Sequence, residues 1–270
     1  ERFGEILNLE DHPSYWSDSG AQVWAVWGED PERTREGAAN VHIPVVADNP
    51  ERVVEECDMV FVMTRSAGLH LDLARPVIEA RNPLFVEKPL TQTPDQAREL
   101  LGLVEASGIN MTSFSTLRYG SAARLYREGL NTAGPVRDAS YIGPATRRNP
   151  YGGILFYAIH AVELMNEFHG ADVVSVRAVE NPPDADKSNI TVACSFGDGT
   201  LVSLALLGDG AYFFYMMAVG QNGMVEVPGT ARNYAEEAAQ KAYETGSGGA
   251  SPGRAVDNPT ADHYENGMRE

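Results

Sequence analysis

Residues 58–97, DMVFVMTRSAGLHLDLARPVIEARNPLFVEKPLTQTPDQA, decide the fold class of this 270-residue chain. Residues 58–63 and 84–86 are continuous apolar runs of strand length, the pattern of strands buried on both faces. Residues 66–75 between them have the apolar spacing of a helix. Thr93-Pro94 then predicts the start of a second helix. We therefore expect strand, helix, strand and helix in this order.

The same alternation extends in both directions from this stretch. Strands are expected at residues 21–27, 45–47 and 109–114, and helices at residues 1–15, from Asp30-Pro31, from Asn49-Pro50 and at residues 93–106. Pro76 is expected to kink or end the helix in which it lies. Strands that alternate with helices over about 110 residues predict a doubly wound α/β fold, with helices on both faces of a parallel sheet.

The pattern changes after Ser115. Helices are expected at about residues 121–130 and 154–168, around a strand at 136–142 and a Gly/Pro-rich loop at 143–153. Strands joined by tight turns follow at residues 189–196, 200–207, 212–219 and 224–227. This predicts an α+β domain with a mainly antiparallel, open sheet. We place the domains at 1–116 and 117–270, with an exposed loop at 246–259 and the beginning of a helix at 262–270.

Composition excludes several classes of partner. The formal net charge is −17 at pH 7, which repels nucleic-acid phosphates and anionic membrane surfaces. Salt screens this field within about 10 Å, so a few positioned donors can still bind one dinucleotide. Cys57 and Cys194 lack the spacing of a disulfide framework or a metal site, and a reduced, cytoplasmic setting fits them. The apolar runs are much shorter than the roughly 20 residues of a membrane helix.

Glu87-Lys88-Pro89 is the most specific chemical signal. Ligands of doubly wound folds bind beyond the carboxyl ends of the strands, where this charged pair is expected. An ammonium group beside a substrate hydroxyl can stabilise the negative charge that develops as hydride leaves the carbon. If the tripeptide stood alone, a surface ion pair would be the better interpretation. Thr64-Arg65-Ser66 and His70 follow the preceding strand, and for His70 a capping or packing role is favoured over catalysis.

These motifs resemble the glucose-fructose oxidoreductase/inositol dehydrogenase/MocA family. Its members share a strand ending in Ala-Thr-Pro, a His four or five residues later, and Glu-Lys-Pro after the next strand. Here Met63-Thr64-Arg65 stands in the first place, and Arg65 adds a cation. The resemblance continues through Arg118-Tyr119, Gly134-Pro135-Val136 and residues 152–163. In the last segment the family often has an Asp four residues before its catalytic His, where this chain has Phe156 before His160.

The resemblance implies an NAD- or NADP-dependent oxidoreductase that acts on a sugar, polyol or related carbohydrate and forms a homo-oligomer through the open face of the second-domain sheet. Lys88 and His160 would be catalytic, although a buried helix histidine is the alternative for His160, and Phe156 weakens the case for the polyol mechanism. Arg118, Tyr119 and Tyr157 would bind substrate. The expected cofactor-binding residues are Glu29, Thr64, Arg65, Ser66, His70, Glu87 and Lys88.

One part of the family pattern has no counterpart in the sequence. The first strand and the Gly-rich turn, whose backbone amides bind the pyrophosphate, would precede residues 1–9, which look like the helix after that turn. Without them we expect weak pyrophosphate binding and an exposed sheet edge. Glu29 suits a ribose diol, whereas Arg33 and Arg35 suit a 2′-phosphate, so both cofactors stay open. Two other functions stay open as well: a non-catalytic dinucleotide-binding regulator and an NAD-dependent glycosidase.

Overall fold

The structure, a computed structural model, describes residues 2–210 and 212–232. The chain divides into two compact units, Glu1–Phe114 and the residues from Ser115 onward. They are called unit 1 and unit 2. The loop expected at residues 246–259 and the helix expected at 262–270 lie outside the described residues.

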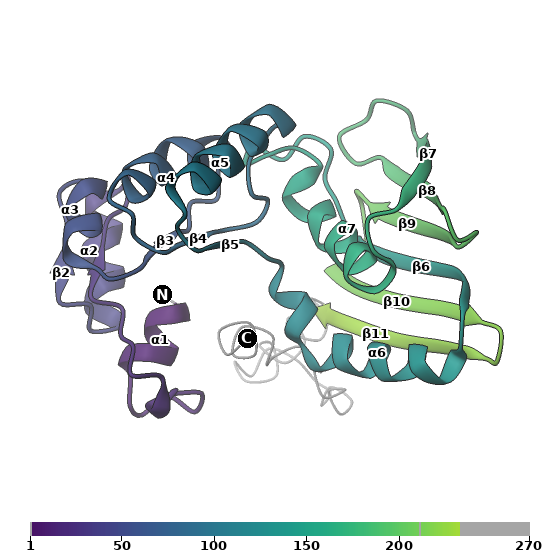
Figure 1. The fold of residues 1–270 in the computed structure, drawn as a ribbon, viewed down its shortest axis with the longest axis horizontal. Helices are drawn as coiled ribbons and strands as arrows, with labels where there is room; N and C mark the ends of the chain where they lie inside the picture. The colour runs from purple at the N-terminus through teal and green to yellow at the C-terminus, as the bar shows by residue number, and fades with distance from the viewer. Residues whose placement is uncertain (1, 211, 233–270) are drawn as a thin grey trace, which may run out of the picture. The chain divides into compact units, whose positions relative to one another are not determined.

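Unit 1 alternates short strands with helices (Figure 1). Its elements are α1 (Arg2–Asn8), β1 (Ala25–Val26), α2 (Pro31–Asn40), β2 (Val45–Val46), α3 (Pro50–Glu56), β3 (Val60–Val62), α4 (His70–Glu79), β4 (Leu84–Val86), α5 (Pro94–Ser107) and β5 (Met111–Thr112), with 3-10 turns at Ser17–Ser19 and Ala67–Leu69. The strands pair in parallel in two sheets, β1–β2 and β3–β4–β5. The expected alternation and parallel pairing are confirmed.

Helices α3, α4 and α5 cover one face of the three-stranded sheet, and α1 contacts the other, where Phe61 is still 43% exposed. On one face, the core contains Val60 and Val62 of β3 together with residues of α3, α4 and α5, among them Leu100. On the other face, four phenylalanines form a row. Neighbouring ring centroids lie 5.5, 5.2 and 5.2 Å apart along Phe3, Phe61, Phe85 and Phe114. Because Phe3 lies in α1, this row packs the first helix against the sheet.

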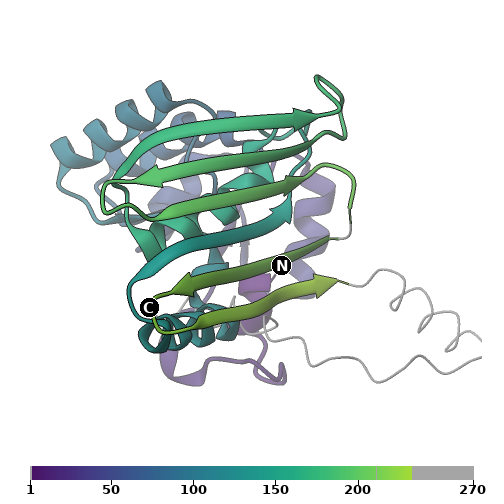
Figure 2. The same ribbon diagram turned by 90° about the vertical axis from the view of Figure 1, so that its right-hand side faces the viewer.

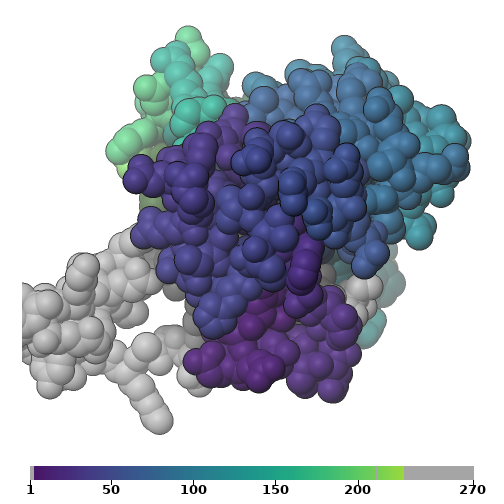
Figure 3. All heavy atoms as spheres, turned by 90° about the vertical axis from the view of Figure 1, so that its left-hand side faces the viewer, coloured from purple at the N-terminus to yellow at the C-terminus, as the bar shows by residue number. Residues whose placement is uncertain are grey.

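The first helix is shorter than expected. It ends at Asn8, whose side-chain amide donates to the carbonyl of Val23 at 2.9 Å and accepts from its N–H at 2.8 Å. This two-way bond satisfies backbone groups just before β1, and residues 9–15 form turns instead of further helix. A Cβ on Gly4 would lie 2.5 Å from Cγ2 of Val41, so a residue without a side chain is needed for this contact. Figure 3 shows the surface where this first segment lies beside the residues of α2 and α3.

The other helix starts agree with their sequence signals. Asp30 caps α2, Asn49 caps α3, and Thr93 forms a reciprocal capping box with Gln96 at the start of α5. Pro76 does not end its helix, because α4 continues to Glu79.

Unit 2 consists of two helices and a six-stranded sheet, among the described residues. After a 3-10 turn at Thr116–Tyr119, its elements are α6 (Ser121–Ala133), β6 (Val136–Pro144), α7 (Leu155–His169), β7 (Val173–Asn181), β8 (Asn189–Phe196), β9 (Leu201–Leu207), β10 (Tyr212–Gly220) and β11 (Met224–Arg232). The strand order is β11-β10-β6-β9-β8-β7, and all neighbours are antiparallel except β6 and β9. The expected mainly antiparallel α+β unit is confirmed.

The two helices cover one face of this sheet, and Figure 2 looks onto the other. Alternate residues such as Val202, Leu204 and Leu206 pack into the core beneath the helices. The intervening residues form what we call the open face. Across it, Val219, Asp138 and Leu201 lie in one row, and Met217, Ser140 and Ser203 lie in the next. No described helix has the length and apolar character needed to cross a membrane.

Candidate functional site

In unit 1, the predicted catalytic lysine lies at the carboxyl end of β4. Lys88 and Glu87 are half-buried and follow this fully buried strand directly. Thr64, Arg65 and Ser66 follow β3, and of these only Arg65 is exposed. Because β3 and β4 are adjacent and parallel, both segments lie at the same edge of the sheet. The structure therefore brings these predicted residues together on two neighbouring loops.

His70 holds these two loops together from inside the protein. Its side chain is fully buried, with Nε2 lying 2.8 Å from the carbonyl oxygen of Thr64 and Nδ1 lying 3.1 Å from that of Leu90. The first carbonyl belongs to the loop after β3, and the second to the loop after β4. His70 therefore has the packing role favoured by the sequence, and it supports both loops. Its contact on the second loop, Leu90, is two residues after Lys88.

Glu29 follows the other sheet of unit 1, the two-stranded sheet of β1 and β2, and it is exposed. The neighbouring Asp30 is occupied as the cap of α2, accepting from the N–H groups of Glu32 and Arg33 at 3.1 Å each. Glu29 thus remains the carboxylate available for the predicted ribose contact.

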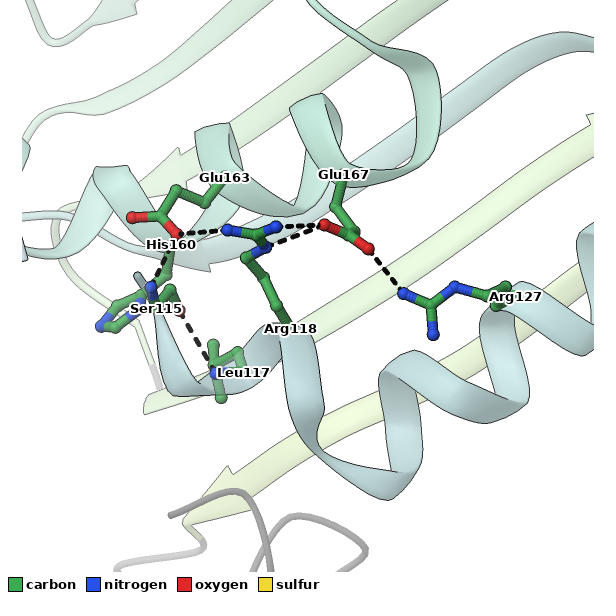
Figure 4. Close-up of polar contacts among 7 residues, drawn as sticks. All are labelled: Ser115, Leu117, Arg118, Arg127, His160, Glu163 and Glu167. Atoms are coloured by element: carbon green, nitrogen blue, oxygen red, sulfur yellow. Dashed lines mark hydrogen bonds and ion pairs between the residues drawn. The ribbon is translucent and has the colours of Figure 1, made fainter. Parts of the chain in front are cut away.

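In unit 2, helix α7 presents His160, Glu163 and Glu167 on one side, at spacings of three and four residues (Figure 4). His160 is 8% exposed, and its Nδ1 lies 2.6 Å from Oγ of the fully buried Ser115. The N–H of Ser115 donates to Oε2 of Glu163 over 2.6 Å. Ser115 Oγ also accepts from the N–H of Leu117 at 3.3 Å, capping the 3-10 turn. Two side chains of α7 therefore hold one serine.

Arg118 is the centre of an ion-pair network on the same side of α7 (Figure 4). Its Nε and Nη2 donate to Oε2 of Glu167 at 2.9 and 2.5 Å, and Nη1 lies 3.8 Å from Glu163. Arg127 binds the other oxygen of Glu167 at 2.6 Å. Burial alone would lower the pKa of Arg118, but the hydrogen bond and charge of Glu167 outweigh it and raise this pKa. The guanidinium is thereby fixed in place, with its carbon 5.7 Å from the ring centroid of Tyr119.

Aromatic side chains surround His160. Its ring lies edge-on to Phe214 at 5.3 Å and tilted to Tyr157 at 6.4 Å. Tyr157 also meets Phe156 at 4.8 Å and Tyr212 at 5.6 Å. This cluster fixes the imidazole plane. Phe156, at the position where the resemblance implies a frequent Asp, adds an aromatic ring to this cluster and offers no carboxylate.

Ser115, Glu167 and Arg127 belong to this network but are not among the residues predicted from the sequence. Glu163 and Glu167 stand three and seven residues after His160, a helical spacing that could have revealed a shared polar side on an otherwise apolar helix. No comparable signal points to Ser115, because its partners are 45 and 48 residues away along the chain.

A family model matches residues 4–113, and it is described as an oxidoreductase family with an NAD-binding Rossmann fold. Unit 1 of the chain is thus similar to the Gfo/Idh/MocA oxidoreductase family. The resemblance drawn from the strand-end motifs is thereby confirmed. The Gfo/Idh/MocA match covers nearly all of unit 1.

Named relatives extend the likeness into unit 2. The chain is 25% identical over 187 residues to UDP-N-acetylglucosamine 3-dehydrogenase of Acidithiobacillus ferrooxidans, covering 68% of this chain and 59% of that protein. It is 24% identical over 233 residues to inositol 2-dehydrogenase of Ralstonia nicotianae, covering 78% and 67%. The crystal structure of GenD2 from gentamicin A biosynthesis in complex with NAD shares the fold, with a TM-score of 0.67, 19% identity, and coverage of 77% of this chain and 65% of that one.

Proposed function

We propose that this protein is an NAD- or NADP-dependent oxidoreductase that transfers hydride to or from a sugar, polyol or related carbohydrate. The observation that carries the proposal is the place of Lys88, half-buried at the carboxyl end of a parallel strand in a unit that matches the Gfo/Idh/MocA family model. Ligands of doubly wound folds bind at this edge. The names of the relatives, dehydrogenases of an amino-sugar nucleotide and of inositol, support carbohydrate as the substrate class.

The residues at the strand ends fit a nicotinamide dinucleotide. Thr64 and Ser66 provide hydroxyls, Arg65 and Lys88 provide cations, and Glu29 provides a carboxylate. Hydroxyls and cations suit phosphate and carboxamide oxygens, and a carboxylate suits a ribose diol. When bound, the nicotinamide would supply the chemistry of accepting or donating a hydride. Glu87 and His70 would support the site from the same two loops.

Within this proposal, Lys88 hydrogen-bonds the reacting oxygen and stabilises negative charge on it. His160 exchanges the proton of that oxygen, because imidazole can both accept and donate a proton near neutral pH. Tyr157, whose ring lies beside His160, donates a hydrogen bond to the substrate. Arg118 and Tyr119 place the substrate, and the ion pairs of Arg118 with Glu163 and Glu167 keep that segment rigid.

The test follows absorbance of the reduced cofactor while the purified protein is offered NAD or NADP and a panel of carbohydrates. Lys88→Met and His160→Gln should each lower kcat by about 100-fold or more, because positioned acid–base groups contribute that much. Lys187→Met is the matched control, since this lysine is exposed and pairs with Asp209 at 3.3 Å on the surface. A folded, cofactor-bound sample that turns over no member of the panel would contradict the proposal.

Phe156 favours a second candidate, a non-catalytic regulator that binds the dinucleotide. Its ring packs on Tyr157 and Tyr151 and provides no acid–base group. Titration calorimetry would show a regulator binding NAD or NADP tightly without any change in cofactor redox state. Release of sugar without net cofactor reduction would instead indicate an NAD-dependent glycosidase.

We also propose that the protein is cytoplasmic and assembles as a homo-oligomer through the open face of unit 2. Leu201 and Val219 on this face are 44% and 40% exposed. Their neighbours Ser140 and Met217 in the next row are a small and an apolar residue, and an apolar surface of this kind is typical of protein–protein interfaces. A second copy of the chain would cover these side chains.

A further inference from the structure

Ser115 contacts the inner nitrogen of the His160 ring in a part of unit 2 that water barely reaches. Ser115 is 0% exposed and His160 is 8% exposed, and their Oγ and Nδ1 atoms lie 2.6 Å apart (Figure 4). The serine itself is held at two further points, by Glu163 at its N–H and by the N–H of Leu117 at its Oγ. A partner fixed in this way also fixes the ring that it contacts.

We propose that Ser115 is the positioning residue of His160, an inference that rests on the redox function proposed above. With Nδ1 engaged by Ser115, Nε2 is the ring nitrogen that exchanges a proton with the substrate. In many enzymes a carboxylate orients the catalytic histidine from behind. Phe156 cannot do this, and the Oε2 atom of Glu163 binds the backbone of Ser115. The hydroxyl of Ser115 takes that role here.

The hydrogen bonds that the Ser115 hydroxyl can make determine which ring nitrogen of His160 carries the proton. A serine oxygen has two lone pairs and one proton. One lone pair accepts from the N–H of Leu117, and the second accepts from Nδ1–H of His160. Nε2 is then unprotonated. During oxidation, the substrate O–H bond would break and its proton would form a new N–H bond at Nε2, while a bound oxidised nicotinamide would supply the acceptor for the hydride that leaves the carbon. Nδ1–H stays bonded to Ser115 throughout, and reduction reverses each step.

The competing arrangement reverses the polarity of the same contact. If the Ser115 hydroxyl donates to Nδ1, the neutral ring carries its proton on Nε2 and cannot accept another from the substrate at that atom. A carboxylate in this position could only accept, so it would allow a single tautomer. Ser115 therefore sets the fraction of His160 rings that are ready to act as a base.

The test observes the ring directly and needs no substrate. In protein labelled with ¹⁵N-histidine, NMR distinguishes protonated from unprotonated ring nitrogens, and His160→Gln identifies the His160 signals. Ser115→Ala should move both ring-nitrogen signals of His160, and Ser115→Thr, which keeps the hydroxyl, should restore them. Ser188→Ala is the matched control, because Ser188 is also a buried serine of unit 2, 1% exposed, and bonds the carbonyls of Pro182 and Ala185. Its loss should leave the His160 signals in place.

On a carbohydrate that the wild type oxidises, Ser115→Ala should lower kcat at least tenfold with little change in KM, and Ser188→Ala should change neither. Unmoved His160 signals in a folded Ser115→Ala protein would overturn the positioning role, whatever the activity. Moved signals in a protein that oxidises nothing would support the contact while overturning the redox function on which the inference rests.

Discussion

His70 is a single side chain that joins two loops of unit 1 through backbone carbonyls of Thr64 and Leu90. His70→Phe keeps a ring in this fully buried place but removes both nitrogens, so the backbone carbonyl that accepts the ring N–H loses its donor. We expect the free energy of unfolding to fall by about 1–3 kcal/mol. Urea unfolding measures it. His42→Asn is the control, because His42 is exposed and its replacement should change stability by less than about 0.5 kcal/mol. Equal losses of unfolding free energy in the two variants would contradict the role of His70 in supporting the two loops.

His169 predicts a pH dependence of unit 2. Burial lowers the pKa of its imidazole, against a smaller opposing effect of Asp198, and the Tyr141 hydroxyl lies 2.8 Å from Nε2. The unfolded chain therefore binds a proton at a higher pH than the folded protein does. The contribution of neutral His169 to the free energy of unfolding is therefore fully present above the usual histidine pKa, and it is lost as the pH falls below that pKa. Urea midpoints at pH 7.5 and 5.5 should show this loss, and His169→Gln should reduce the difference. If the difference between the two urea midpoints were the same in His169→Gln as in the wild type, His169 would not be the cause of the pH dependence.

At the scale of elements, the Arg118–Glu167 pair joins α7 to the 3-10 turn before α6. Two nitrogens meet one carboxylate oxygen, and the side chains are 30% and 21% exposed. A double-mutant cycle of Arg118→Ala and Glu167→Ala should give a coupling energy of about 1 kcal/mol in urea unfolding. The control cycle uses Arg98 and Asp95, which pair within α5 at 73% and 94% exposure and should show no measurable coupling. Similar coupling energies for the two pairs would show that partial burial does not strengthen the Arg118–Glu167 ion pair.

At the scale of the whole molecule, the open face predicts self-association. Leu201→Lys should shift the protein toward monomers, because a charge buried between two copies would lose its hydration. Light scattering coupled to size-exclusion chromatography measures the mass. Leu125→Lys is the matched control, since Leu125 is 53% exposed on α6 and lies away from this face. A wild type that is monomeric at micromolar concentration would count against the assembly.

The sequence by itself determined the order and type of the elements. Apolar runs such as residues 84–86, helix starts such as Thr93-Pro94, and turns such as residues 197–199 each depend on neighbours a few positions apart. Parallel pairing in unit 1 followed because a helix connects successive strands there. The place of Lys88 at a strand end was also a local inference, since Glu87-Lys88-Pro89 directly follows a buried strand.

Only the tertiary structure decided which side chains work together. Ser115 and His160 are 45 residues apart, His70 and Leu90 are 20 apart, and Asn8 and Val23 are 15 apart. A helix or strand pattern shows which face of an element is buried, but not which polar atom of another element will lie within 3 Å of it. Hydrogen bonds are directional over that short range. Their partners are therefore settled by how the elements pack, after local sequence has already determined what the elements are.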